Sequence, residues 1–136
     1  MHALLKVLVP FLLALVSFAT SAQTPPTTPT PTPPKLQQFV YVLKVSPAFH
    51  DATRWTAREN EAVGRHFARL KDATAAGRVI FAGRSNEALS ATFGLVVFEA
   101  ESEPAARQFM ETDPAVEAGV MTATLHPYVL ALQRRP

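Results

Sequence analysis

The stretch Phe93 to Ala100, FGLVVFEA, decides the fold because apolar residues occupy both of its alternating faces. Leu95 and Val96, for example, point to opposite sides of an extended chain. A second stretch, Gln38 to Val45 (QFVYVLKV), shares this property and is rich in β-branched and aromatic residues. Such stretches predict strands that are covered on two sides. We therefore expect both to lie at the centre of a sheet.

A helical pattern follows the earlier of these two strands. Thr56 and Glu59 form a T-x-x-E capping box, which satisfies the first backbone N–H groups of a helix. Gly77 stands where a helix favours a left-handed residue after its last turn. Between them, apolar residues recur at helical spacing, at Val63, Phe67, Leu70 and Ala73. The sequence predicts one long helix across this segment.

A short strand and a second helix flank the stretch FGLVVFEA. Arg78 to Ala82 (RVIFA) predicts the short strand, and the polar stretch Gly83 to Thr92 predicts the connection that follows it. Ser102 can cap a helix with Pro104 in its first turn.

The C-terminal part of the chain predicts a short turn and a last strand. Asp113 and Pro114 begin an extra helical turn that Gly119 closes. Met121 to Leu132 (MTATLHPYVLAL) predicts the strand, and Pro127 within it indicates an edge position or a bulge.

The elements follow the order strand, helix, strand, strand, helix, strand. This order predicts an α+β fold of the ferredoxin-like βαββαβ type. Two helices cover only one face of such a sheet, yet the central strands are apolar on both faces. The same face of a second copy is the simplest cover, so we expect a homodimer.

Residues 1–22 predict a secretory signal peptide. Lys6 precedes an apolar run, Val7 to Ala19, and the small residues Ala19 to Ala22 (ATSA) suit a signal peptidase. A membrane-spanning helix needs about 20 apolar residues, and this run is shorter. We expect cleavage after Ala22, a periplasmic or secreted protein, and no membrane association afterwards.

Residues 23–37 predict a disordered Pro/Thr-rich linker. Every residue from Thr24 to Pro34 is Thr or Pro, a composition that has nothing to bury and favours extended polyproline conformations. It is either a spacer or a leader without a role. The folded domain is expected over residues 38–136.

Composition narrows the classes of function. The chain has 13 Lys plus Arg and 11 Asp plus Glu, so removal of Lys6 leaves 12 against 11. No basic stripe with interleaved aromatics appears, and we expect no nucleic-acid partner. The chain has no cysteine, which excludes disulfides and thiolate chemistry. Neither metal-ligand spacings nor a phosphate-binding glycine loop occurs, so we expect no metal and no cofactor.

His66 is the first candidate for catalysis. It follows Val63 and precedes Leu70 at helical spacing, so its ring should lean toward the apolar face. An imidazole there can serve as a base near neutral pH. The alternative, which spacing alone favours, is a half-buried structural histidine that is bonded to a backbone carbonyl.

Asp113 is the second candidate. A carboxylate that accepts from one ring nitrogen of a histidine fixes its tautomer and stabilises its charged form. Asp113 before Pro114 is also what a helix start requires, and these two roles do not exclude each other.

Four further residues are candidates for substrate binding. Arg84 and Ser85 follow Gly83 at a strand end, where they could hold an anionic or hydroxylated ligand or form a solvated hairpin tip. On the last strand His126 and Tyr128 share a face, which would line the pocket or a dimer interface.

Two patches carry a resemblance to a known family. The first patch has the spacing H-x2-RL-x6-G-x2-I-x-AG, at His66, Arg69, Leu70, Gly77, Ile80, Ala82 and Gly83. The second patch is DPAVEAGV, Asp113 to Val120. Together, on this order of elements, they resemble the YciI-like (YCII-related) family of dimeric α+β barrel proteins.

The resemblance implies a homodimer with a pocket between helix and sheet, and a histidine–aspartate site that falls here on His66 and Asp113. Some relatives are linked to lyase-type removal of chloride from hydroxylated aromatics. We therefore hypothesise an exported lyase- or isomerase-like enzyme that transfers a proton on a small organic molecule. The alternative is a non-catalytic dimeric module that binds a small ligand or a protein.

Overall fold

The computed structural model describes residues 35–134. The predicted signal peptide and most of the predicted linker lie outside these residues. Within them, no helix combines the length and apolarity that crossing a membrane requires.

Four antiparallel strands form one sheet in the order β2-β3-β1-β4. They are β1 (Gln37–Val45), β2 (Val79–Arg84), β3 (Phe93–Ala100) and β4 (Met121–Pro127). The two stretches with apolar residues on both faces, β1 and β3, occupy the centre, and β4 is an edge strand, as predicted. The sequence and the structure therefore agree on an α+β fold of the ferredoxin-like type.

The ends of two strands differ from the predictions, and the starts of β1 and β2 differ by one residue each. β2 continues through Arg84, so this residue belongs to the strand rather than to the connection. β4 ends at Pro127 instead of Leu132. Its partner β1 begins at Gln37, so the register leaves no β1 residue opposite any residue beyond Val129. After Pro127, the backbone N–H of Tyr128 donates to the carbonyl of Gln38 at 2.9 Å, and that of Leu130 donates to the side-chain Oε1 of Gln38 at 2.9 Å.

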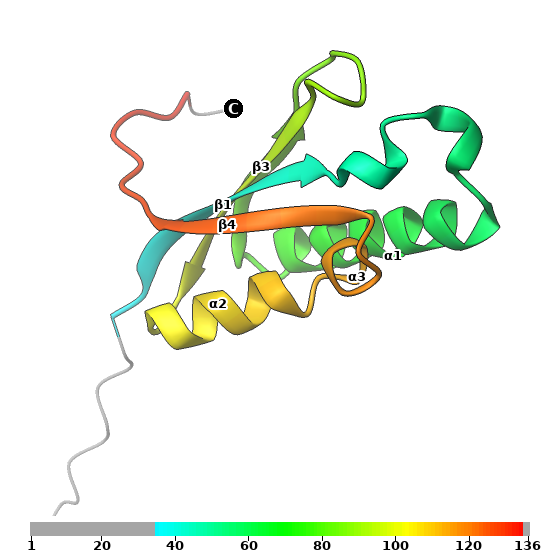
Figure 1. Cartoon of the computed structure of the whole chain (residues 1–136). Coiled ribbons are helices and arrows are strands. Elements are labelled where there is room, and N and C mark those ends of the chain that lie inside the picture. The colour runs from blue at the N-terminus through cyan, green and yellow to red at the C-terminus, as the bar shows by residue number, and fades with distance from the viewer. Residues whose placement is uncertain (1–34, 135–136) are drawn as a thin grey trace, which may run out of the picture. The chain divides into compact units, whose positions relative to one another are not determined.

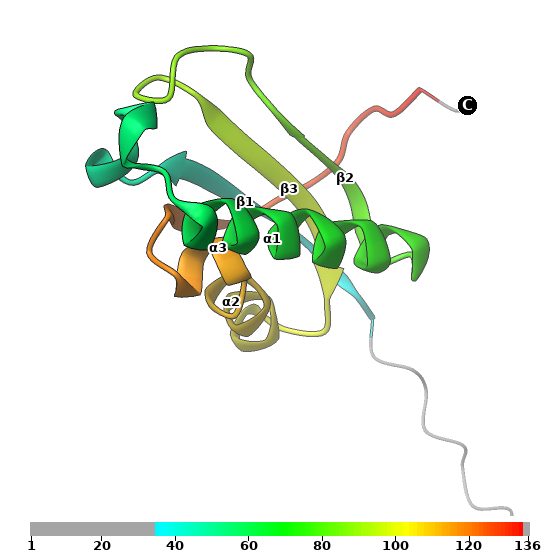
Figure 2. The same ribbon diagram turned by 90° about the vertical axis from the view of Figure 1, so that its right-hand side faces the viewer.

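Three α-helices lie on one face of the sheet (Figures 1 and 2). They are α1 (Ala57–Ala75), α2 (Glu103–Glu111) and α3 (Pro114–Glu117). The predicted capping box at the start of α1 is formed in both directions. Gly77 and Gly119 have φ of 77° and 71°, so each takes the left-handed conformation that ends a helix. Two single 3₁₀ turns, Pro47–Phe49 and Ala52–Arg54, connect β1 to α1.

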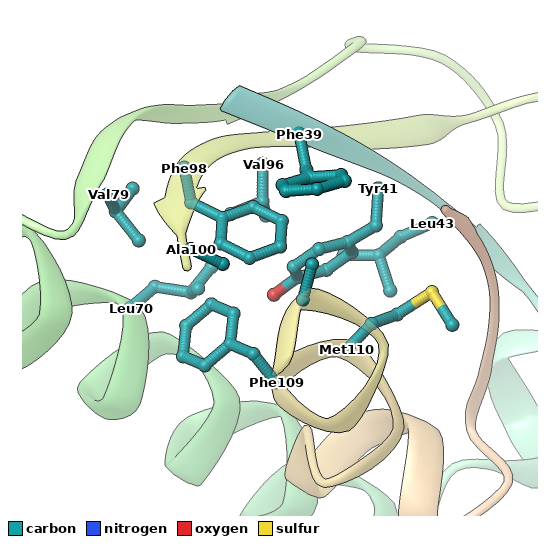
Figure 3. Packing of buried hydrophobic residues seen from close by; sticks show 11 residues of the cluster. Phe39, Tyr41, Leu43, Leu70, Val79, Val96, Phe98, Ala100, Phe109 and Met110 are labelled. Atoms are coloured by element: carbon teal, nitrogen blue, oxygen red, sulfur yellow. The ribbon is translucent and has the colours of Figure 1, made fainter. Parts of the chain in front are cut away.

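An aromatic core fills the space between the sheet and the helices (Figure 3). The ring of Phe98 lies 4.9 Å from that of Phe109 and 5.7 Å from that of Tyr41, measured between centroids. Aromatic pairs at such distances contribute about 0.5–1.5 kcal/mol beyond their buried area. Tyr41 is fully buried, so its hydroxyl requires a hydrogen-bond partner inside the protein.

No described helix lies on the opposite face of the sheet (Figure 1). On that face Val42 of β1 lies beside Leu95 of β3 and Thr124 of β4. Phe93 is 38% exposed, whereas Thr124 and His126 provide polar groups at the β4 edge. This helix-free face is therefore apolar at its centre and polar along one side.

Candidate functional site

A histidine from α1 and an aspartate at the start of α3 form a hydrogen-bonded pair. Nδ1 of His66 lies 2.7 Å from Oδ2 and 2.9 Å from Oδ1 of Asp113. The side chain of His66 is 12% exposed, and that of Asp113 is fully buried. The partner of His66 is therefore a carboxylate rather than a backbone carbonyl.

Asp113 serves at the same time as the N-cap of α3. Its Oδ1 accepts from the backbone N–H of Ala115 at 3.0 Å, and its Oδ2 accepts from the hydroxyl of Tyr41 at 3.0 Å. The carboxylate thus has donors from three elements. The cap and the pairing with His66 coexist, because the two roles use different lone pairs of the same group.

Burial and hydrogen bonding act in opposite directions on Asp113. Burial alone would raise the pKa of the Asp113 carboxyl, but the hydrogen bond and charge of His66 lower it. The donors from Ala115 and Tyr41 add to the lowering, and the net pKa lies below the usual value. Asp113 is therefore ionised at neutral pH.

Tyr41 is held in its neutral form. Burial of the phenol, followed by the nearby Asp113 carboxylate, raises the pKa of Tyr41 far above its usual value. The hydroxyl accordingly stays a donor to Asp113 over the whole physiological range. Its role here is to hold the carboxylate in place.

Arg69 fixes the segment that leads to Asp113. Its Nη2 donates to the carbonyl of Phe109 at 2.9 Å and to Oγ1 of Thr112 at 2.8 Å. The guanidinium also lies over the ring of Phe109, 4.4 Å from the centroid. These contacts join α1 to the end of α2, next to the aspartate.

The geometry selects one tautomer of His66. Because an ionised carboxylate can only accept, Nδ1 carries the proton that it receives. Nε2 then has a free lone pair, and it makes no hydrogen bond with any residue in the described part of the chain. An imidazole with an oriented Nδ1–H and an open Nε2 can accept a proton from a ligand.

His66 lines a cavity of about 1180 Å³ between α1 and the sheet. One flank of α1 forms the roof, with Val63, Phe67 and Thr74, and the sheet forms the floor. Trp55 and Leu89 also line it. The lining is mainly apolar, and the space is large enough for a small organic molecule.

Small residues create this cavity. Ala82 of β2 and Gly94 of β3 line it from the helix-covered face of the sheet, and neither residue is large enough to fill the space under α1. A Cβ atom at Gly94 would meet the side chain of Leu43 at 3.4 Å. The small size of these residues therefore leaves space between the sheet and α1.

The structure brings three of the six predicted site residues to this region. His66 and Arg84 line the cavity, and Asp113 lies behind His66. Ser85 is absent from the lining, because its hydroxyl accepts from the backbone N–H of Phe93 at 3.1 Å and closes the β2–β3 connection.

His126 and Tyr128 lie away from the cavity. His126 pairs with Val40, whose neighbours on β1, Phe39 and Tyr41, face the helices, so His126 belongs to the helix-free face. Tyr128 lies beyond the end of β4. His126 and Tyr128 were predicted to line either the pocket or a dimer interface. They do not line the pocket, and the dimer interface stays a prediction.

Sequence reasoning missed three residues of this region: Tyr41, Phe67 as part of the cavity, and Lys71. A tyrosine within a strand that is apolar on both faces was an available signal, since a buried hydroxyl needs a partner. No comparable signal marked the cavity wall. Among residues 35–134, no group of three His, Asp or Glu side chains could hold a metal ion.

The fold and the site define a ferredoxin-like α+β protein with a histidine–aspartate pair beside an apolar cavity. The model of the YCII-related domain matches residues 38–125, and the chain belongs to this family. No curated protein matches it.

One similar solved structure is the 5-chloro-2-hydroxyhydroquinone dehydrochlorinase of Burkholderia phenoliruptrix, in complex with 2,5-dihydroxybenzoquinone. The match has 19% sequence identity and a TM-score of 0.52, and it covers 68% of this chain and 93% of that one. At this identity the likeness supports the fold alone.

Proposed function

We propose that this protein is a small-molecule enzyme of the lyase or isomerase type in which His66 transfers a proton. One observation carries the proposal. Nδ1 of His66 is held 2.7 Å from the buried carboxylate of Asp113, while the ring lines an apolar cavity. A ligand in that cavity would meet an imidazole that is already oriented.

The proposed step begins with removal of a proton from the ligand by Nε2. Asp113 stabilises the imidazolium that forms and keeps Nδ1 protonated. In an elimination the electron pair of the broken C–H bond becomes a new π bond, and the leaving group departs with its own bonding pair. In an isomerisation the imidazolium returns the proton to another atom of the ligand.

The similar solved structure guides the choice of substrates. Its name states that it removes chloride from a hydroxylated aromatic compound. The aromatic wall of the cavity in this chain would accept a ligand of that kind, with Trp55 and Phe67 beside the ring. Hydroxylated aromatics with and without chlorine are accordingly the first compounds to test.

The test compares the wild-type domain with His66→Gln and with His126→Gln as a matched control. Turnover is followed by absorbance and by chloride release. We expect His66→Gln to lower kcat by a factor of about 100 or more, and His126→Gln to leave kcat unchanged. Turnover that survives His66→Gln would contradict proton transfer by this residue. Ligand binding without turnover in either protein would favour a non-catalytic binding module.

We also propose that the protein is a homodimer joined through the helix-free face of the sheet. Val42 and Leu95 lie at the centre of that face and are only half-buried in the single chain. Apolar side chains there gain stability from a second copy of the same face. Sedimentation of the domain as a monomer at micromolar concentration would contradict this arrangement.

Finally, we propose that the protein is exported and acts in the periplasm or outside the cell. The apolar run Val7 to Ala19 and the small residues before Gln23 support this. Expression of the full chain followed by N-terminal sequencing of the processed protein tests it. A protein that retains Met1 in the cytoplasmic fraction would refute export.

A further inference from the structure

The cavity beside His66 is surrounded by charges of one sign. Three cationic residues line it, but Lys44 follows Leu43 on β1, so its side chain belongs to the helix-free face. Of the other two, Lys71 lies on α1 and Arg84 at the end of β2, whereas no Asp or Glu is among the described residues that line the cavity. Neither cation forms an ion pair with any residue in the range 35–134. Two cations are thus available to an anionic group at the mouth of the cavity.

Register places Arg84 on the cavity side of the sheet. Arg84 lies beside Gly94, and Gly94 lies beside Leu43, whose side chain belongs to the core under the helices. Because Gly94 has no side chain, the side chain of Arg84 has no neighbour at this position on β3. The guanidinium makes no hydrogen bond with the described part of the protein, so its donors remain available for a ligand.

The opposite wall is apolar and incompletely covered. Phe67 of α1 lines the cavity with 70% of its surface exposed. Trp55 also lines the cavity, and its Nε1 already donates to the carbonyl of Phe49 at 2.8 Å. A flat apolar group placed against Phe67 would remove part of this surface from water.

We propose that the cavity binds a small aromatic monoanion, with its ring against Phe67 and its charged group at Arg84 and Lys71. This inference rests on the cavity of the proposed function but requires no catalysis. The charge of the lining favours an anion over a neutral ligand of the same shape, and a cation is disfavoured. Arg84 is the residue that distinguishes an anionic ligand from a neutral one, because its planar guanidinium can donate two hydrogen bonds to a carboxylate or phenolate group.

The test uses two probes of nearly equal shape, 2-naphthoate and the neutral 2-naphthamide. Their affinities for the purified domain are measured by isothermal titration at low ionic strength. We expect 2-naphthoate to bind about tenfold more tightly, since a charge-assisted contact at a partly exposed site is worth about 1.4 kcal/mol. Added salt should reduce this preference.

Three variants assign the preference to residues. Arg84→Gln should remove most of the tenfold difference while leaving 2-naphthamide unaffected. Phe67→Ala should weaken both probes alike. Arg58→Gln, which removes an exposed cation of α1 outside the cavity, should change neither affinity. Far-UV circular dichroism of each variant confirms that the domain remains folded.

Three results would overturn the proposal: equal affinity for the two probes, a preference that persists in Arg84→Gln, or no binding of either probe. Each of these is read from binding alone. Loss of turnover in His66→Gln is a separate measurement, so proton transfer and anion selection can fail independently.

Discussion

Replacement of Asp113 by Asn should destabilise the protein in a way that depends on pH. The carboxylate accepts from His66, from the hydroxyl of Tyr41 and from the backbone N–H of Ala115. An Asn side chain has the same shape but only one oxygen, so its amide nitrogen must replace an acceptor. At least one buried donor then loses its partner.

The magnitude follows from that lost contact. A hydrogen bond to a charged group contributes about 1.5–3 kcal/mol, and an unsatisfied buried donor costs about 1–3 kcal/mol. The lost hydrogen bond and the unsatisfied donor are partly the same effect, so the two values are not simply added. We expect Asp113→Asn to lower the free energy of unfolding by about 2–4 kcal/mol at neutral pH. That is a large fraction of the roughly 5–15 kcal/mol typical of a domain.

The pH dependence follows from the lowered pKa of Asp113. The stabilisation by its carboxylate is complete above the unfolded-state value of 3.8, and it is lost as the pH falls through the lower folded-state pKa. In that acidic window the wild-type carboxyl becomes neutral, like the amide of Asn. The difference between the two proteins should therefore shrink there to about 1 kcal/mol or less.

Urea unfolding followed by circular dichroism and by the fluorescence of Trp55, the single tryptophan, measures this difference at a fixed protein concentration. Glu117→Gln is the control, since it removes an exposed carboxylate from the same short helix and should change stability by less than about 0.5 kcal/mol. A loss below about 0.5 kcal/mol for Asp113→Asn, or the same loss at every pH, would refute the reasoning.

Three further predictions concern the same elements. Tyr41→Phe removes one donor from Asp113, so the pKa of Asp113 should rise toward its usual value in a carbon-13 NMR titration, and stability should fall by about 1 kcal/mol; an unchanged pKa would show that the hydroxyl does not support the carboxylate. Nitrogen-15 NMR of neutral His66 should report the Nδ1–H tautomer in the wild type and a shift toward Nε2–H in Asp113→Asn, whereas the same tautomer in both would contradict the proposed orientation. Val42→Lys at the centre of the helix-free face should convert the proposed dimer to a monomer in analytical ultracentrifugation, and Thr122→Lys at the β4 edge of that face, as control, should weaken it less.

The fold was readable from the sequence because its signals are local. The capping box at Thr56 and the left-handed glycine at position 77 marked the ends of α1, and apolar residues on both faces identified the central strands. The end of β4 has no local signal in the sequence. Residues after Pro127 are apolar enough for a strand, but β1 begins at Gln37, so residues beyond Val129 have no partner strand, which only the register reveals.

The site could be predicted only in part. His66 and Asp113 are 47 residues apart, and spacing alone favoured a backbone carbonyl as the partner of the histidine. Their pairing was implied by the family resemblance, and the structure contains the hydrogen bond. Arg84 and Ser85 are adjacent in the chain, yet only Arg84 reaches the cavity, since Ser85 is used to close the turn.

The three hydrogen-bond donors of Asp113 lie far apart in the chain, which affects when their contacts can form during synthesis. Tyr41 lies in the first strand, His66 in the first helix, and the carboxylate that joins them emerges from the ribosome only after α2. A nascent chain that stops before residue 113 has an imidazole without its orienting partner and a buried phenol without its acceptor. The hydrogen bonds of Asp113 to His66 and to Tyr41 can therefore form only after the chain has been synthesised beyond residue 113.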